Sequence, residues 1–120
     1  MENLELRMAV AEANGWTTGT NKGGEFAMWP PGSDKKKWPY GISCPHYELD
    51  DHHALDALKE FCEKGDGDRK YLFEILQTQN GRYRVIIFYR STLECIAEKV
   101  DKSLAKAASL VIREAAKGKK

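Results

Sequence analysis

The residue types best suited to chemistry gather in one short stretch, residues 44–53, which reads Cys-Pro-His-Tyr-Glu-Leu-Asp-Asp-His-His. All three histidines of the chain lie in it, together with one thiol and three carboxylates. Imidazole, thiolate and carboxylate groups are the ligands that zinc takes in proteins, and a site needs three or four of them that converge. The candidate ligands for such a metal site are Cys44, His46, His52 and His53.

The spacing of these residues argues against a metal. His52 and His53 are neighbours on an expected helix, so their side chains diverge by about 100°. The HExxH spacing that brings two histidines to one helix face is absent from the sequence. We therefore expect Asp50 to cap the helix and the histidines to be solvated in its first turn, with no metal and no cofactor.

A nucleophilic cysteine meets a similar objection. Cys44 has His46 and His52 as candidate bases, but a reactive thiolate needs a nearby cation or a helix N-terminus. Cys44 lies well before the expected helix start at Asp50. The chain has three cysteines and no CxxC pair, which argues against both a zinc ribbon and a disulfide framework. We expect reduced thiols and no enzymatic activity.

Residues suited to binding lie upstream, in a segment rich in glycine and proline that runs from residue 17 to residue 47. Its rings and lysines are types found where binding energy concentrates, and they also suit a phosphate backbone or a stacked base. Two arginines near an expected hairpin add positive charge. The candidate binding residues are Trp29, Lys35, Lys36, Lys37, Trp38, Tyr40, Arg82 and Arg84.

The composition limits the classes of protein to which the chain can belong. Its 120 residues carry 19 Lys plus Arg against 18 Asp plus Glu, a formal net charge of +1. This balance gives no global attraction to nucleic acid or to an anionic membrane. With 42% hydrophobic residues the chain is too apolar for disorder, yet no apolar run approaches the roughly 20 residues that span a bilayer. We expect one domain over residues 1–117 and a short basic tail at 118–120.

Hydrophobic periodicity predicts the elements of the first half. A helix is expected from Leu4 to Asn14, on a stripe of Leu4, Met8 and Ala11 that has Leu6, Val10 and Ala13 beside it. Gly15 is expected in the left-handed position that ends this helix. Residues 25–29 suggest a short strand, and the rest of 17–47 is expected to be irregular, with its rings packed on the core. A second helix begins at Asp50 and ends at Lys64–Gly65.

The second half predicts a sheet and a closing helix. Strands are expected over 71–77 and 82–89, joined at Asn80–Gly81, where both residues tolerate a positive φ. Residues 93–100 fit a strand or a helix, and a third strand is favoured. The last helix is capped by Asp101 or Ser103 and carries an apolar stripe. The class is α+β, in which a small antiparallel three-stranded meander packs with three helices in the order α-(loop)-α-β-β-β-α.

Several segments in this order resemble the phage ABA sandwich domain, a family of phage and prophage proteins. The similar segments are Ala9–Trp16, Trp29–Gly32, Pro45–Asp50 and Leu104–Ala115. The sequence departs from the family at Ser43–Cys44, at His52–His53 and in the Lys35–Lys37 run. The resemblance implies an α/β sandwich, a phage or prophage origin and the cytoplasm of a bacterial host, but no reaction.

These observations favour an accessory protein that acts by binding, with a host or phage protein as partner and counter-defence as one use. The alternative is a small-molecule or nucleotide binder that uses the aromatic loop and the hairpin arginines, and nucleic acid is the weaker partner. A metal- or thiol-dependent enzyme is least favoured. Because a three-stranded sheet has two edges, pairing with a second copy stays open.

Overall fold

The computed structural model describes residues 2–117, so the predicted basic tail at 118–120 lies outside the described residues. Within that range the chain forms three helices and six strands, and the strands make two antiparallel three-stranded sheets. The helices are α1 (Glu2–Ala13), α2 (Asp51–Lys64) and α3 (Leu104–Lys117). The small sheet contains β1 (Thr17–Thr20), β2 (Phe26–Trp29) and β3 (Ile42–Ser43), and the large sheet contains β4 (Tyr71–Gln77), β5 (Tyr83–Tyr89) and β6 (Cys95–Asp101). The predicted α+β class is confirmed.

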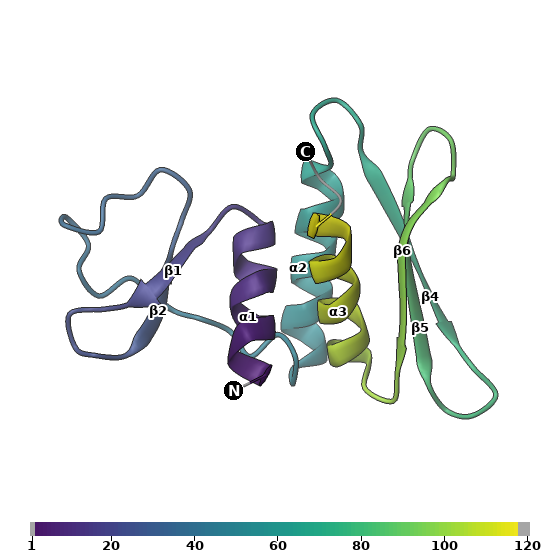
Figure 1. The fold of residues 1–120 in the computed structure, drawn as a ribbon, viewed down its shortest axis with the longest axis horizontal. Helices are drawn as coiled ribbons and strands as arrows, with labels where there is room; N and C mark the ends of the chain where they lie inside the picture. The colour runs from purple at the N-terminus through teal and green to yellow at the C-terminus, as the bar shows by residue number, and fades with distance from the viewer. Residues whose placement is uncertain (1, 118–120) are drawn as a thin grey trace.

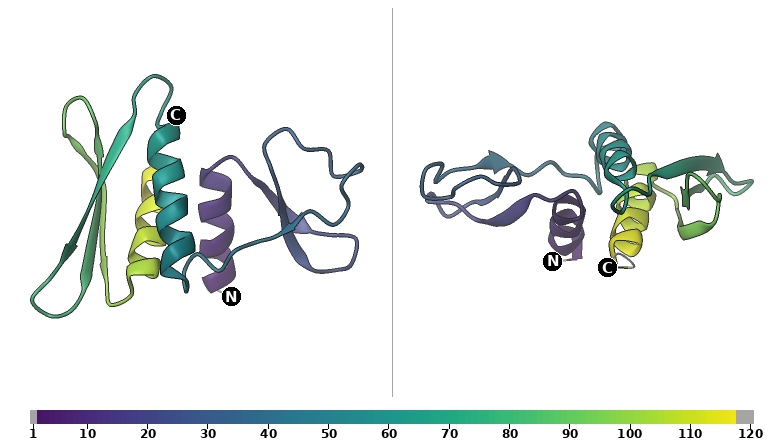
Figure 2. Two further views of the ribbon diagram at one scale, coloured as in Figure 1. Left: turned by 180° about the vertical axis from the view of Figure 1, so that it is seen from behind. Right: turned by 90° about the horizontal axis from the view of Figure 1, so that it is seen from above.

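The helices lie between the two sheets (Figure 1). α2 and α3 cover one face of the large sheet, and α1 packs against α3 on the side away from it. Views from behind and from above show the small sheet next to α1, at the end opposite the large sheet (Figure 2). The molecule is elongated, with extents of 46 × 34 × 20 Å. No helix in the described range is long and apolar enough to cross a membrane.

The large sheet is the meander that the sequence predicts. β4 and β5 pair from Tyr71↔Tyr89 to Gln77↔Tyr83, and β6 pairs antiparallel with β5, so residues 95–101 are strand and not helix. The hairpin turn is different from the expected one. Gly81 has a φ of +74°, but Asn80 does not have a positive φ. The N–H of Thr78 donates to the carbonyl of Arg82, which makes a three-residue loop closed by a left-handed glycine.

The helix ends follow local rules. Gly15 has a φ of +87°. Its N–H donates to the carbonyl of Glu12, and the N–H of Trp16 donates to the carbonyl of Ala11. These two bonds form a Schellman motif, which satisfies the last carbonyls of α1. The Asp50 carboxylate caps α2 by accepting the N–H groups of His52 and His53. For α3, Ser103 of the two candidates is the cap, because its hydroxyl accepts the N–H of Lys106.

The buried stripe of α1 is turned from the predicted one. Leu6, Val10 and Ala11 are buried, whereas Leu4 is 40% exposed. The reason is that α1 contacts α3 on one side and β1 on another, so its core side is not the stripe that begins at Leu4. α3 is buried on most of its surface, because alanines let it lie close to α1, α2 and the large sheet.

The segment expected to be irregular contains the small sheet, of which the sequence predicted β2 alone. β1 pairs with β2 from Thr17↔Trp29 to Thr20↔Phe26, and β3 adds only two residues on the other side. The one fully apolar strand, β2, buries Ala27, Met28 and Trp29. We call residues 17–43 the aromatic lobe.

Candidate binding site on the aromatic lobe

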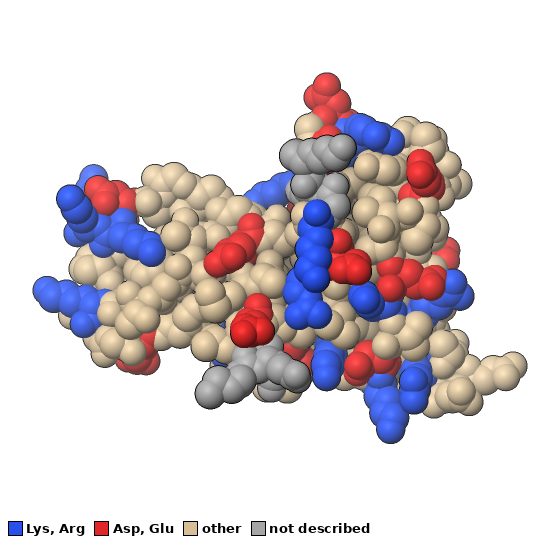
Figure 3. All heavy atoms as spheres, in the orientation of Figure 1, with Lys and Arg blue, Asp and Glu red and all other residues tan. Residues whose placement is uncertain are grey.

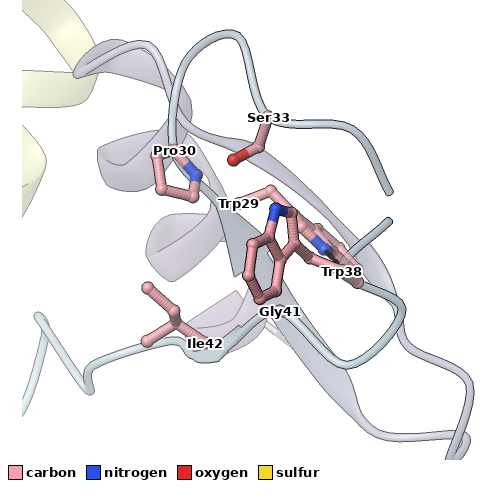
Figure 4. A pocket seen from close by; sticks show the side chains of 6 residues that line it. All are labelled: Trp29, Pro30, Ser33, Trp38, Gly41 and Ile42. Carbon is pink, nitrogen blue, oxygen red and sulfur yellow. Dashed lines mark hydrogen bonds between the residues drawn. The ribbon is translucent and has the colours of Figure 1, made fainter. Parts of the chain in front are cut away.

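A pocket of about 210 Å³ opens on the aromatic lobe. Its lining is mainly apolar and comes from the end of β2, the loop that follows it and the start of β3 (Figure 4). The close-up shows both tryptophan side chains at the pocket, with a proline, a serine and an isoleucine near them. The lining residues are Trp29, Pro30, Ser33, Trp38, Gly41 and Ile42.

Trp29 is the fixed floor of this pocket. Its side chain is only 2% exposed, and its indole N–H donates to the carbonyl of Trp38 at 2.6 Å. The Lys35 ammonium lies 4.7 Å from the centre of the Trp29 ring, at cation–π distance. Trp29 is therefore a buried support with a satisfied N–H, and Trp38 supplies the exposed ring of the pocket.

The loop from residue 30 to residue 41 is held by its own hydrogen bonds. Gly32 has a φ of +81° next to Pro31, and the N–H of Ser33 donates to the carbonyl of Pro30, as a type II turn requires. The Asp34 carboxylate then accepts the N–H of Lys36, and the Asp34 carbonyl accepts two further N–H groups. The lysines and Trp38 are therefore displayed by an ordered turn.

Asn21 joins this loop to the β1–β2 hairpin, and sequence reasoning missed its role. Its side-chain oxygen accepts the N–H groups of Gly23 and Glu25, and its amide donates to the carbonyl of Tyr40. The N–H of Lys22 also donates to the carbonyl of Pro39. An asparagine before two glycines signals a turn, but nothing in the sequence shows that it reaches a loop about twenty residues away.

Exposed apolar side chains lie at the edge of the pocket, and a run of three lysines lies in the loop between two of its lining residues, Ser33 and Trp38. Trp38 is 61% exposed, Tyr40 58% and Ile42 49%, although large apolar side chains usually turn inward. Basic side chains lie at the outer end of the lobe in two separate groups, with acidic side chains near them (Figure 3). The basic side chains belong to Lys22, Lys35, Lys36 and Lys37. An apolar pocket beside a run of lysines suits a ligand that carries a flat or branched apolar group beside a negative charge.

The structure brings together six of the eight candidate binding residues and separates the other two. Trp29, the three lysines, Trp38 and Tyr40 belong to the aromatic lobe, with Trp29 as a buried support. Arg82 lies in the β4–β5 hairpin and Arg84 lies on β5, on the far side of the helices (Figure 1). The lining of the pocket on the aromatic lobe contains neither arginine. Ile42 belongs to the site and was missed, because its strand is too short to leave a pattern.

The residues of the candidate metal site do not gather. Within residues 2–117 no group of three or more His, Cys, Asp or Glu side chains is placed to hold a metal ion. Cys44 is buried, while His52 and His53 are exposed and lie near the carboxylates of Asp56 and Asp50. The backbone N–H of His53 leads the interactions that hold the pKa of Asp50 below its usual range. These contacts are those of a capped, solvated helix start.

Cys44 is in the wrong environment for a nucleophile. Burial raises the pKa of its thiol to about 11, and the nearby Arg7 only partly opposes this effect. Cys62 is also buried, and burial raises the pKa of its thiol to about 12. Both thiols are therefore protonated near neutral pH, whereas a nucleophilic cysteine needs a depressed pKa.

Comparisons with protein-family models, with curated proteins and with solved structures found no match to this chain. What can be inferred of its function rests on the geometry described above.

Proposed function

We propose that this chain is a non-enzymatic binding protein whose aromatic lobe holds a segment of a partner protein. One observation carries the proposal: an apolar pocket with a buried Trp29 floor opens beside the exposed Trp38 and three consecutive lysines. Exposed tryptophan and tyrosine rings are where interface energy concentrates, because they bury a large area at a low entropic cost.

The chemistry of the pocket defines the partner segment. It carries an apolar side chain that packs against the exposed ring of Trp38 in the pocket, and an Asp or Glu close to it that reaches the lysines of the loop. The lysines supply an attraction that salt screens over about 8–10 Å, so binding weakens as ionic strength rises. The apolar contact does not weaken with salt.

Selection from a random peptide library on the immobilised chain tests this proposal. We expect enriched peptides that pair an aromatic, proline or branched apolar residue with a nearby acid. Trp38→Ala should lower the affinity of a selected peptide by about 30-fold, and reversal of Lys35, Lys36 and Lys37 to Glu should abolish binding. The matched control is Leu49→Ala, because Leu49 is 66% exposed and does not line the pocket.

Two results would overturn the proposal. One is an absence of enrichment, and the other is a set of peptides that bind Trp38→Ala and the parent chain equally. Single-stranded oligonucleotides form a parallel arm, because exposed rings and lysines also suit stacked bases and phosphates. Tight binding of an oligonucleotide that Trp38→Ala abolishes, without any peptide selected, would assign the lobe to nucleic acid instead of protein.

A further inference from the structure

The outer face of the large sheet is the second unpartnered surface of the molecule. All the helices in Figure 1 lie on the other side of this sheet. Strand alternation and pairing place the outer side chains in rows across the three strands. Leu72 lies opposite Phe88 in the first row; the second row is Glu74, Ile86 and Glu98, and the third is Leu76, Arg84 and Val100.

This face mixes apolar side chains with charges in a fixed pattern. Leu72, Leu76 and Val100 are 40–43% exposed, which is unusual for large apolar residues on a sheet. Arg84 donates to Glu98 across the strands, through Nε at 2.6 Å and through Nη2. Among the described residues, no Lys, Arg or His side chain lies within ion-pair distance of Glu74, because the nearby Arg84 pairs with Glu98. The face therefore has one arginine between two acidic positions, of which one is unpaired.

We propose that a second copy of this chain binds the outer face of the large sheet, and that the charges set the geometry of the dimer. The twofold axis lies in the interface, perpendicular to the strands and between the second and third rows. The third row of one copy then lies over the second row of the other. Each Arg84 falls over Ile86 of the other copy, between its Glu74 and Glu98.

The same axis also accounts for the hairpin arginine and for the exposed first row. Along β5 the outer positions run Arg84, Ile86 and Phe88, and Arg82 lies in the hairpin two residues before Arg84. With the axis between Arg84 and Ile86, Arg82 of one copy reaches the ring of Phe88 in the other, where a cation–π contact is favourable. Moving the axis to the second row would place acid over acid, because Glu74 would meet Glu74 of the other copy. Like charges in contact disfavour that arrangement.

The size of the face limits the affinity. Strands of seven residues, three across, give a footprint of roughly 23 by 14 Å. This footprint is smaller than the roughly 800 Å² per partner of a standard interface. The dimer is therefore weak and concentration-dependent, and sedimentation velocity over a wide concentration range is the measurement that detects it.

A charge-exchange experiment tests the dimer and its axis. Arg84→Glu makes the charges of the second and third rows wholly acidic, and the double variant Glu74→Lys with Glu98→Lys makes them wholly basic. Each variant should dimerise at least tenfold more weakly than the parent chain, because each now repels its own copy. An equimolar mixture of the two should dimerise again, since the acidic face meets the basic one.

The control for Arg84→Glu is Lys106→Glu, which also replaces a positive charge with a negative one. It lies at an exposed position of α3 and should leave dimerisation unchanged. A parent chain that stays monomeric at every concentration would overturn the proposal, and so would a mixture that does not dimerise. Because the mixture regains what each variant loses, a folding defect cannot imitate the expected result. Binding of peptides by the aromatic lobe is measured separately and does not enter this test.

Discussion

Glu48 shows how a single buried charge ties the segment after the aromatic lobe to α1. It lies in the segment between β3 and α2, is 2% exposed, and accepts two hydrogen bonds from the Arg7 guanidinium of α1, at 3.1 and 2.9 Å. Burial acts to raise the pKa of Glu48, but the hydrogen bonds and charge of Arg7 outweigh it and the pKa is lowered. Arg7 is thus the main compensation for a carboxylate that is buried in the charged form.

Arg7→Met keeps most of the side-chain stem and removes this partner. We expect the free energy of unfolding at pH 7 to fall by about 3 kcal/mol, because an uncompensated carboxylate stays buried. In the parent chain, the stability that Glu48 contributes is present above its unfolded pKa of about 4.3 and is lost as the pH falls. The deficit of Arg7→Met should therefore shrink towards pH 4 in urea unfolding, and a deficit of equal size at pH 7 and pH 4 would contradict this account.

Ser109 is a buried residue that contributes little. It is fully buried in α3, and its hydroxyl has no hydrogen-bond partner among the described residues. Ser109→Ala removes the unmet hydroxyl and favours the helix, so we expect the free energy of unfolding to rise by about 1 kcal/mol. Ser103→Ala is the contrasting control: it removes the cap of α3 and should lower stability by about 1 kcal/mol. Denaturant midpoints of the two variants should move in opposite directions.

At the scale of the element, local chemistry predicts where helices and long strands begin and end. The caps at Gly15 and Asp50 and the strand of residues 71–77 follow from neighbouring residues, so the sequence alone reveals them. β1 and β3 are different, because four and two residues carry no clear period. β3 forms because a loop of about a dozen residues returns to β2, and the hydrogen bonds of Asn21 help to hold that loop.

The candidate site could be predicted only in part, because residue types are evident in the sequence but their packing is not. The rings and lysines are evident as residue types, but which ring is a floor and which is a rim depends on packing. Trp29 is buried because it belongs to the one apolar strand of the lobe, whereas Trp38 lies on the loop and is exposed. The distance between the lobe and the hairpin arginines follows from the order of the layers, which no local pattern contains.

Gly41 is the position on which the shape of the lobe depends most. It has a φ of +59°, and an added Cβ would lie 2.8 Å from the Trp29 ring and 2.9 Å from the Met28 carbonyl. Gly41→Ala should therefore displace Trp29 and loosen β2 and β3. Gly32→Ala is the matched control, because Gly32 also has a positive φ but has open space around it. We expect Gly32→Ala to lower the free energy of unfolding by about 1–2 kcal/mol, because alanine is strained in the left-handed conformation. Amide hydrogen exchange of residues 26–29 should speed up strongly in Gly41→Ala, while α3 stays protected. Equal exchange in the two variants would contradict the steric argument.

Across the whole molecule, the order of the layers separates the aromatic loop from the hairpin arginines, two groups that the sequence had suggested as one binding surface. The helices stand between the aromatic lobe and the large sheet, so the lysines and the hairpin arginines face different partners (Figure 2). The inner side chains hold these layers together, and they include several titratable groups. Cys44 and Tyr47 lie in the core between the lobe and the helices, and Cys62 and Tyr71 lie between α2 and the large sheet.

Burial of these four groups makes the whole fold sensitive to alkali. It raises the pKa of Cys44 to about 11 and those of Tyr47, Cys62 and Tyr71 to about 12. In the unfolded chain a thiol titrates near about 8.5 and a phenol near about 10. The folded state therefore retains protons that the unfolded state releases, and the stability they provide is present below pH 8.5 and lost as the pH rises towards 12.

The thiols dominate the first part of this loss, between about pH 8.5 and 10, at about 1.4 kcal/mol per pH unit for each thiol. Urea unfolding at a series of pH values measures the slope. Cys62→Ala removes one of the two buried thiols, so it should lower stability at pH 7 through the space it leaves, yet roughly halve the slope above pH 8.5. Cys95→Ala removes an exposed thiol and should leave the slope unchanged. A slope that responds equally to both substitutions would show that burial is not what makes the fold sensitive to alkali.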